Sequence, residues 1–210
     1  MVFDKIYIIS YIYNLDKRQK ISKYLKKELG INNFEFIYGI DPNISNIKDI
    51  NIYDRNIMSS PYILYGNKNK DEYYLHTISC GLAHLTAFQH AYINSYNKIL
   101  IIEDDVDFIL NNEKILTYFN NIPNDADLIH YGYIEHFDNS PQNPNELYHK
   151  IDSHLIVAGA QCYAICNYQA LEKIINGYKQ VLYTADQFWE HICLNRYIVL
   201  NKICKDQKYK

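Results

Sequence analysis

The stretch KILIIEDDVD, residues Lys98 to Asp107, joins an unbroken aliphatic run to four acidic side chains. The residues Ile99–Ile102 are typical of a strand that is buried on both faces, as in a parallel sheet. No Gly, Pro or Asn separates this strand from the acids, so we expect the carboxylates to lie directly at its carboxyl end. In an open α/β sheet, ligands bind at this edge.

These crowded carboxylates favour a metal site, because burying an unpaired carboxylate is costly and a cation removes that cost. Mg²⁺ and Mn²⁺ accept carboxylate oxygens and keep coordination positions open for substrate phosphates. Two triplets fit such a site, Glu103-Asp104-Asp105 and Asp105-Val106-Asp107, and their spacing does not choose between them. A solvated turn is the alternative interpretation of the same acids.

The chain on either side predicts one α/β domain over residues 1–210, with a mainly parallel central sheet flanked by helices. Lys5–Ile9, a helix that ends at Gly30, and Phe34–Tyr38 form a βαβ unit, and a helix over residues 77–96 leads into the central strand. Asn167 is expected to cap a later helix. Loops are expected over residues 43–75 and 133–153, and further strands over residues 127–131, 155–158, 162–165 and 197–200.

Composition excludes several functional classes. A net charge of -3 gives no electrostatic footprint for nucleic acid. No run approaches the roughly 20 apolar residues of a membrane span, and Ile6–Ile9 lacks a signal-peptide cleavage site, so we expect a cytoplasmic protein. The cysteines are odd in number and contain no CxxC pair, which favours free thiols in a reducing compartment: Cys80, Cys162, Cys166, Cys193 and Cys204.

Four blocks of the chain, in order, resemble glycosyltransferase family 25, the group of lipopolysaccharide and collagen sugar transferases. Arg18 falls on one of the family's arginines, and Gly39–Pro42 lies where the family has AxDG. Cys80 and His84 match the family's IGCxLSH, and residues 101–106 match ILEDDV apart from one Ile for Leu. The four blocks are residues 9–21, 78–84, 101–106 and 159–171.

The resemblance implies a GT-A-like fold and an inverting transfer of a hexose from UDP-galactose or UDP-glucose, with Mn²⁺ or Mg²⁺ as cofactor. The acceptor would be a hydroxyl of a glycan, of lipopolysaccharide or of a collagen-like protein. The metal ligands implied are Asp105, Asp107 and His191. The residues expected to contact the nucleotide sugar are Ser10, Arg18, Asp41, His84, Glu103 and Asp104.

An inverting transfer in one step needs a base that takes the proton of the acceptor hydroxyl. Asp186 is the candidate, with Glu190 as the second choice, and the neighbouring Phe188 and Trp189 could shield Asp186 and stack on a sugar face. Asp186 is equally well an ordinary helix cap, and His84 equally well a structural histidine.

Two other functions use the same acids. One is a metal-dependent phosphohydrolase, which would need no acceptor, although the chain has no Gly-rich phosphate loop. The other is a catalytically inactive relative that binds a nucleotide or a partner, and the intact triplet Glu103–Asp105 counts against it.

Overall fold

The computed structural model describes residues 2–39, 70–136, 146–152, 155, 157–178, 189 and 192–206. Its elements, in chain order, are β1 (Lys5–Tyr11), α1 (Leu15–Lys23), the π-helical turn η1 (Tyr24–Glu28), β2 (Phe34–Gly39), α3 (Lys70–Ile93), β3 (Ile99–Glu103), β4 (Val106–Phe108), α4 (Asn112–Asn120), β5 (Leu128–Gly132), β6 (Glu135–His136), β7 (Tyr148–Ile151), β8 (Val157–Ala158), β9 (Cys162–Ile165), α5 (Tyr168–Tyr178), β10 (Arg196–Val199) and β11 (Cys204–Asp206).

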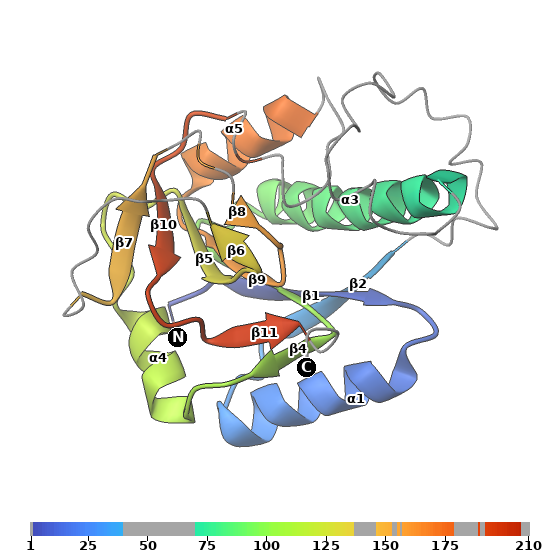
Figure 1. Cartoon of the computed structure of the whole chain (residues 1–210), viewed down its shortest axis with the longest axis horizontal. Helices are drawn as coiled ribbons and strands as arrows, with labels where there is room; N and C mark the ends of the chain where they lie inside the picture. The colour runs from blue at the N-terminus through green and yellow to red at the C-terminus, as the bar shows by residue number, and fades with distance from the viewer. Residues whose placement is uncertain are drawn as a thin grey trace.

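A seven-stranded sheet in the order β2-β1-β3-β9-β5-β10-β7 forms the centre of the molecule (Figure 1). The pairs β1–β2, β1–β3 and β5–β10 are parallel, whereas β9 runs antiparallel to both β3 and β5, and β7 antiparallel to β10. The α/β class is confirmed, but the sheet is mixed rather than mainly parallel. In the described part of the chain no helix lies between β5 and β9, and without a helical crossover the returning strand runs in the opposite direction.

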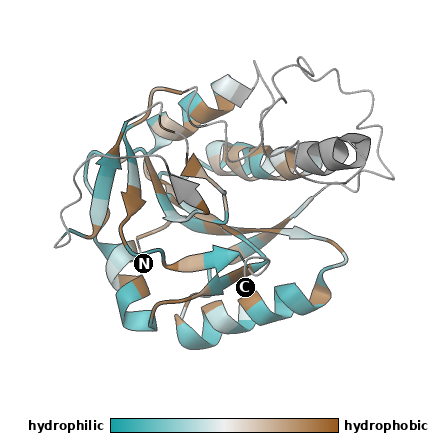
Figure 2. Ribbon diagram, in the orientation of Figure 1, coloured by the Kyte–Doolittle hydropathy of each residue, from teal (hydrophilic) through white to brown (hydrophobic). Residues whose placement is uncertain are grey.

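The two faces of the sheet carry separate apolar clusters, because side chains alternate along each strand. Ile8 of β1 belongs to the cluster that includes Leu25 of η1, while its neighbour Tyr7 belongs to the cluster that includes Phe88 of α3. The helices α1 and α3 therefore cover opposite faces, as Figure 1 shows. In Figure 2 the outer side of α1 is mostly hydrophilic and β10 is hydrophobic. None of the helices in the described ranges has the length and apolar character of a bilayer span.

The strand predicted at the centre is there: Ile99–Ile102 are at most 1% exposed, and β3 lies between β1 and β9. The predicted cap of α5 is also confirmed, since Oδ1 of Asn167 accepts a 2.8 Å hydrogen bond from the Ala170 backbone N–H. The helix predicted over residues 77–96 is α3, which begins earlier, at Lys70.

One expected loop is wrong. β7 and β6 lie within residues 133–153, and β7 pairs along β10 with Tyr148 and Ile151 buried. Its four residues include the polar His149 and Lys150, so the segment carries too short an apolar pattern to predict a strand. Two further pairs of strands, β11–β4 and β6–β8, stand apart from the central sheet.

The order β2-β1-β3 creates a topological switch point. From β1 the chain moves through α1 to β2 on one side, and then returns through α3 to β3 on the other side of β1. The connections on the two sides lie on opposite faces, so the carboxyl ends of β1 and β3 border an opening that open α/β sheets use for ligands.

Candidate active site at the carboxyl ends of β1 and β3

A cavity of about 380 Å³, here called the crevice, lies at this switch point. Its wall combines residues that follow β1 with the acids that follow β3, and α3 adds Cys80 to it. The acids predicted from the sequence thus lie where the topology predicts a ligand. The polar side chains at the two strand ends are Ser10, Asn14, Lys17, Glu103, Asp104 and Asp105.

The carboxylate of Asp104 is held in place by hydrogen bonds at the crevice. It is 7% exposed, and its Oδ2 accepts hydrogen bonds from the Ser10 hydroxyl at 2.6 Å and from the Asn14 amide at 3.2 Å. Its backbone N–H donates to the Ile9 carbonyl at 3.0 Å. A buried carboxylate needs such donors, and here they all come from the segment at the end of β1. Asn14 occupies the N-cap position of α1, but its side chain makes no cap hydrogen bond.

The carboxylates of Asp105 and Asp104 both lie near the ammonium group of Lys17. The Lys17 ammonium lies 3.4 Å from Oδ2 of Asp105 and 3.9 Å from Oδ1 of Asp104, and the Lys17 side chain is 36% exposed. Two carboxylate oxygens therefore converge on one positive charge at the rim of the crevice. Hard oxygen ligands that already converge on a cation fit Mn²⁺ or Mg²⁺, provided that the flexible lysine side chain moves aside.

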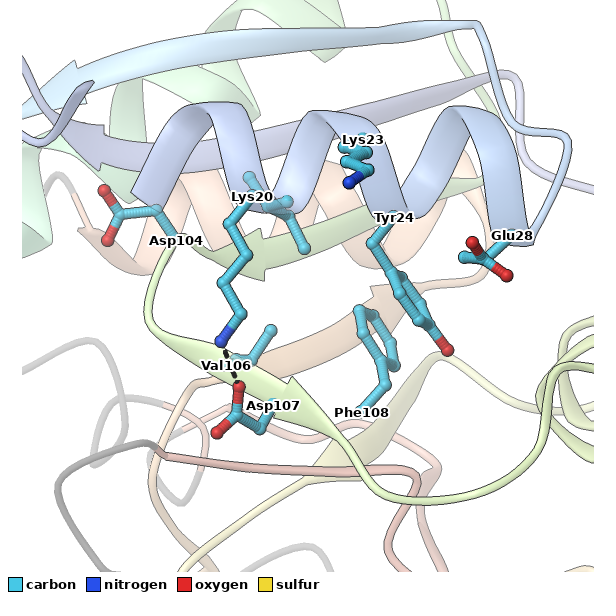
Figure 3. A pocket seen from close by; sticks show the side chains of 9 residues that line it. Lys20, Lys23, Tyr24, Glu28, Asp104, Val106, Asp107 and Phe108 are labelled. Carbon is cyan, nitrogen blue, oxygen red and sulfur yellow. Dashed lines mark hydrogen bonds and ion pairs between the residues drawn. The ribbon is translucent and has the colours of Figure 1, made fainter. Parts of the chain in front are cut away.

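Asp107 faces a different cavity. This second cavity, of about 310 Å³, lies between α1, η1 and β4 (Figure 3), and in it Oδ1 of Asp107 lies 2.6 Å from the Lys20 ammonium. The rings of Tyr24 and Phe108 stack along its wall at 4.7 Å between centroids. Asp104 lines both cavities, whereas Asp105 lines the crevice and Asp107 the second cavity.

Glu103 lines the crevice, and its carboxylate lies against residues of α3. Its Oε1 lies 3.4 Å from Nε2 of His84 and 3.9 Å from Sγ of Cys80. His84 is fully buried, and its Nδ1 shares a 2.6 Å hydrogen bond with the Tyr163 hydroxyl of β9. The structure thus places His84, a predicted contact of the nucleotide sugar, beneath the described residues that line the crevice. Tyr163 was not singled out from the sequence, although it lies in the fourth family-like block.

Arg18 lies apart from these residues. Its guanidinium donates a 2.8 Å hydrogen bond to the Ile12 carbonyl and lies over the Tyr38 ring, 5.0 Å from the centroid. It is not among the described residues that line the crevice. Four other predicted site residues lie outside the described residues: Asp41, Asp186, Glu190 and His191.

The ring of Trp189 belongs to the core. It is 1% exposed and packs edge-on against Phe88 and Tyr163, with centroids 6.1 and 5.0 Å away. The predicted stacking on a sugar face is therefore wrong for Trp189, because a wholly buried ring offers no face to a ligand, while Phe188 lies outside the described residues. Its packing against Tyr163 instead supports the residue that holds His84.

Comparisons with known proteins agree with the family-like blocks. The family model described as "Glycosyltransferase family 25 (LPS biosynthesis protein)" matches residues 3–189. No curated protein matches the chain. Among solved structures, the chain is similar to the one titled "Crystal Structure of A197 from STIV", with 12% identity over 93% of this chain and 81% of that chain, and a TM-score of 0.47.

Proposed function

Because this chain belongs to glycosyltransferase family 25, we propose that it transfers galactose or glucose from a UDP-sugar to a hydroxyl of a glycan, lipopolysaccharide or collagen-like acceptor. We further propose that the fold is of the GT-A type. The observation that carries the proposal is the pair Asp104 and Asp105, whose carboxylates converge on one cation in a crevice at the switch point of the sheet. The crevice has the size for a nucleoside diphosphate, and a divalent cation at these acids would offset the negative charge that such a ligand brings.

Asp105, with Asp104 beside it, would hold Mn²⁺ or Mg²⁺. The metal would supply positive charge where the leaving diphosphate becomes negative as the glycosidic bond breaks. Of the two triplets, the geometry favours the one that ends at Asp105, because Asp105 lines the crevice whereas Asp107 lines the second cavity. His191 stays in the proposal as a further ligand.

The chain's own residues would orient the donor around this charge. Ser10 and Asn14 fix the carboxylate of Asp104, so its position does not depend on the ligand. Lys17 would turn from the two acids to a phosphate oxygen once a divalent cation takes its place. Glu103, on the floor of the crevice, would accept a hydrogen bond from a hydroxyl of the sugar or the ribose.

The transfer would invert the anomeric centre in one step. A carboxylate on the acceptor side would then remove the proton of the attacking hydroxyl while the bond to the diphosphate breaks. Asp186 is our candidate for this base, and Glu190 is the second.

Binding of the donor tests the proposal most directly. We expect UDP-galactose or UDP-glucose to raise the melting temperature only with Mn²⁺ or Mg²⁺ present. The shift should be measurable, because a ligand at 100 times its Kd stabilises the native state by about 2.7 kcal/mol. Asp105→Asn should abolish the shift. Asp125→Asn is the control, since Asp125 is a half-exposed carboxylate paired with Lys150, ahead of the amino end of β5.

Turnover then separates the competing functions. The proposal requires that UDP release depends on a hydroxyl-bearing acceptor. If no UDP-sugar shifts the melting of the wild-type protein, the donor assignment fails. Release of phosphate from phosphate esters without an acceptor would instead identify a phosphohydrolase.

A further inference from the structure

Three potential metal ligands of different chemistry meet on the floor of the crevice. Sγ of Cys80, a ring nitrogen of His84 and a carboxylate oxygen of Glu103 all lie within 4.8 Å of one another. Two of them come from successive turns of α3 and the third from the end of β3. A thiol, an imidazole and a carboxylate differ from the all-oxygen pair Asp104 and Asp105, so this cluster favours a different ion.

The separations of these atoms fit a tetrahedral zinc ion. With Zn–N and Zn–O bonds of about 2.0–2.1 Å and a Zn–S bond of about 2.3 Å, tetrahedral angles put N and O about 3.4 Å apart and S and O about 3.6 Å apart. Nε2 of His84 lies 3.4 Å from Oε1 of Glu103, and Sγ of Cys80 lies 3.9 Å from that same oxygen. These two separations lie within about 0.3 Å of the tetrahedral values.

The orientation of His84 adds an independent observation. The residue is fully buried, and among the described residues its Nε2 has no hydrogen-bond partner, although Oε1 of Glu103 lies 3.4 Å away. Buried polar atoms without a partner are rare in native proteins. Its Nδ1 meets the Tyr163 hydroxyl at 2.6 Å. When Nδ1–H donates to that hydroxyl, the lone pair of Nε2 points at the cluster, as in metal-binding histidines held by a second partner.

We propose that Cys80, His84 and Glu103 form a zinc site. The thiolate selects a borderline-soft ion over Mg²⁺ or Mn²⁺, so this site is separate from the cation position at Asp104 and Asp105. Cys80 and Glu103 line the crevice, so the fourth position of the zinc faces the cavity. A water molecule, or an oxygen of whatever occupies the crevice, would complete the coordination. The proposal holds whether or not the chain is a transferase.

Cobalt titration tests the site, because Co²⁺ replaces zinc and a thiolate ligand gives it a near-ultraviolet charge-transfer band. Metal-stripped full-length protein should bind one Co²⁺ per chain with this band, and one equivalent of Zn²⁺ should abolish it. Cys80→Ser should eliminate the band. Cys193→Ser is the matched control, since Cys193 is exposed and its band should equal that of the wild type.

A second variant guards against misfolding. Tyr163→Phe keeps all three ligands and removes the hydroxyl that holds His84, so Zn²⁺ affinity should fall about 10–100-fold, the usual effect of losing such a partner. Absence of the band in the wild type, or its persistence in Cys80→Ser, would overturn the zinc site. Asp105→Asn separates this outcome from the fate of the transferase proposal: it should keep the cobalt band and lose the Mn²⁺-dependent binding of the UDP-sugar.

Discussion

Ser10 and Asp104 are 94 residues apart in the sequence, yet the Ser10 hydroxyl donates a 2.6 Å hydrogen bond to Oδ2 of Asp104. This bond ties the carboxyl end of β1 to the turn that follows β3. The two sides of the crevice are thereby held together by one of the residues that we propose to act on the ligand.

Ser10→Ala removes this bond from a buried carboxylate. Hydrogen bonds to charged groups contribute about 1.5–3 kcal/mol, so we expect the free energy of unfolding to fall by that amount and the Kd of the UDP-sugar to rise. Urea unfolding and donor titration measure the two effects. Thr86→Ala is the control, because it removes an exposed hydroxyl that bonds a carbonyl of its own helix. Equal effects of the two substitutions would contradict the prediction.

Lys17→Met should change metal binding. Without nucleotide, the Lys17 ammonium competes with a divalent cation for Asp104 and Asp105, so its removal should raise Mn²⁺ affinity about fivefold, corresponding to about 1 kcal/mol for a partly exposed ion pair. Calorimetric titration with Mn²⁺ measures it. Lys20→Met is the matched control, since Lys20 pairs with Asp107 in the second cavity. If only Lys20→Met raises the affinity, the metal belongs to the triplet that ends at Asp107.

The buried position of His130 predicts how the free energy of unfolding depends on pH. Complete burial, and the Arg196 guanidinium 3.3 Å from its Nε2, hold the pKa of His130 well below the ordinary 6.5. The folded protein therefore keeps this histidine neutral, whereas the unfolded chain binds a proton below about pH 6.5. Stability should fall as the pH drops below that value, by up to about 1.4 kcal/mol per pH unit from this residue.

Denaturant unfolding at pH 7.5 and 5.5 checks this dependence, with His130→Gln beside the wild type. The variant has no imidazole at this position, so its stability should change less between the two pH values. Identical pH dependence of the two proteins would show that His130 does not cause the loss.

Gly132→Ala should destabilise the fold through one contact. A Cβ at this position would lie 2.4 Å from Sγ of Cys204 in β11, closer than any real carbon–sulfur contact. Such overpacking typically costs about 1–3 kcal/mol. The double variant with Cys204→Ala should lose less stability than the two single variants together, because the alanine removes the opposing sulfur. Additive losses would place the cause elsewhere.

Sequence patterns predicted the elements that form the crevice but not the directions of its side chains. The run Ile99–Ile102 marked the buried strand, and the acids at its end marked the site. Asp105 and Asp107, two residues apart, would share one face of a continuous strand. The chain instead makes a turn at Asp104 and Asp105 before β4 begins, so the two carboxylates enter different cavities. Spacing alone contains no sign of that turn.

Other features of the fold were not predicted from the sequence for different reasons. The helix α4 went unpredicted although its signals are ordinary: Asn111 caps it, accepting a 2.9 Å hydrogen bond from the Lys114 backbone N–H, and Ile115 and Phe119 are buried one turn apart. The direction of β9 depends on how the chain returns between β5 and β9, which a local pattern does not contain. The proximity of Tyr163 to His84 follows from that direction, since β9 carries Tyr163 alongside β3.

The pairing of β4 with β11 determines the order in which parts of this protein can form during synthesis. Val106, next to the acidic cluster, is matched with Asp206, and Ile203 nearby donates its backbone N–H to the Tyr131 carbonyl. A ribosome releases the acids long before it releases the strand that holds β4 in place. A nascent chain, or one cut by a protease before Cys204, therefore has every residue of the seven-stranded sheet and every acid of the cluster, but no strand paired with β4. Synthesis of residues 204–206, rather than the appearance of the acidic motif, is the moment at which β4 gains its partner strand.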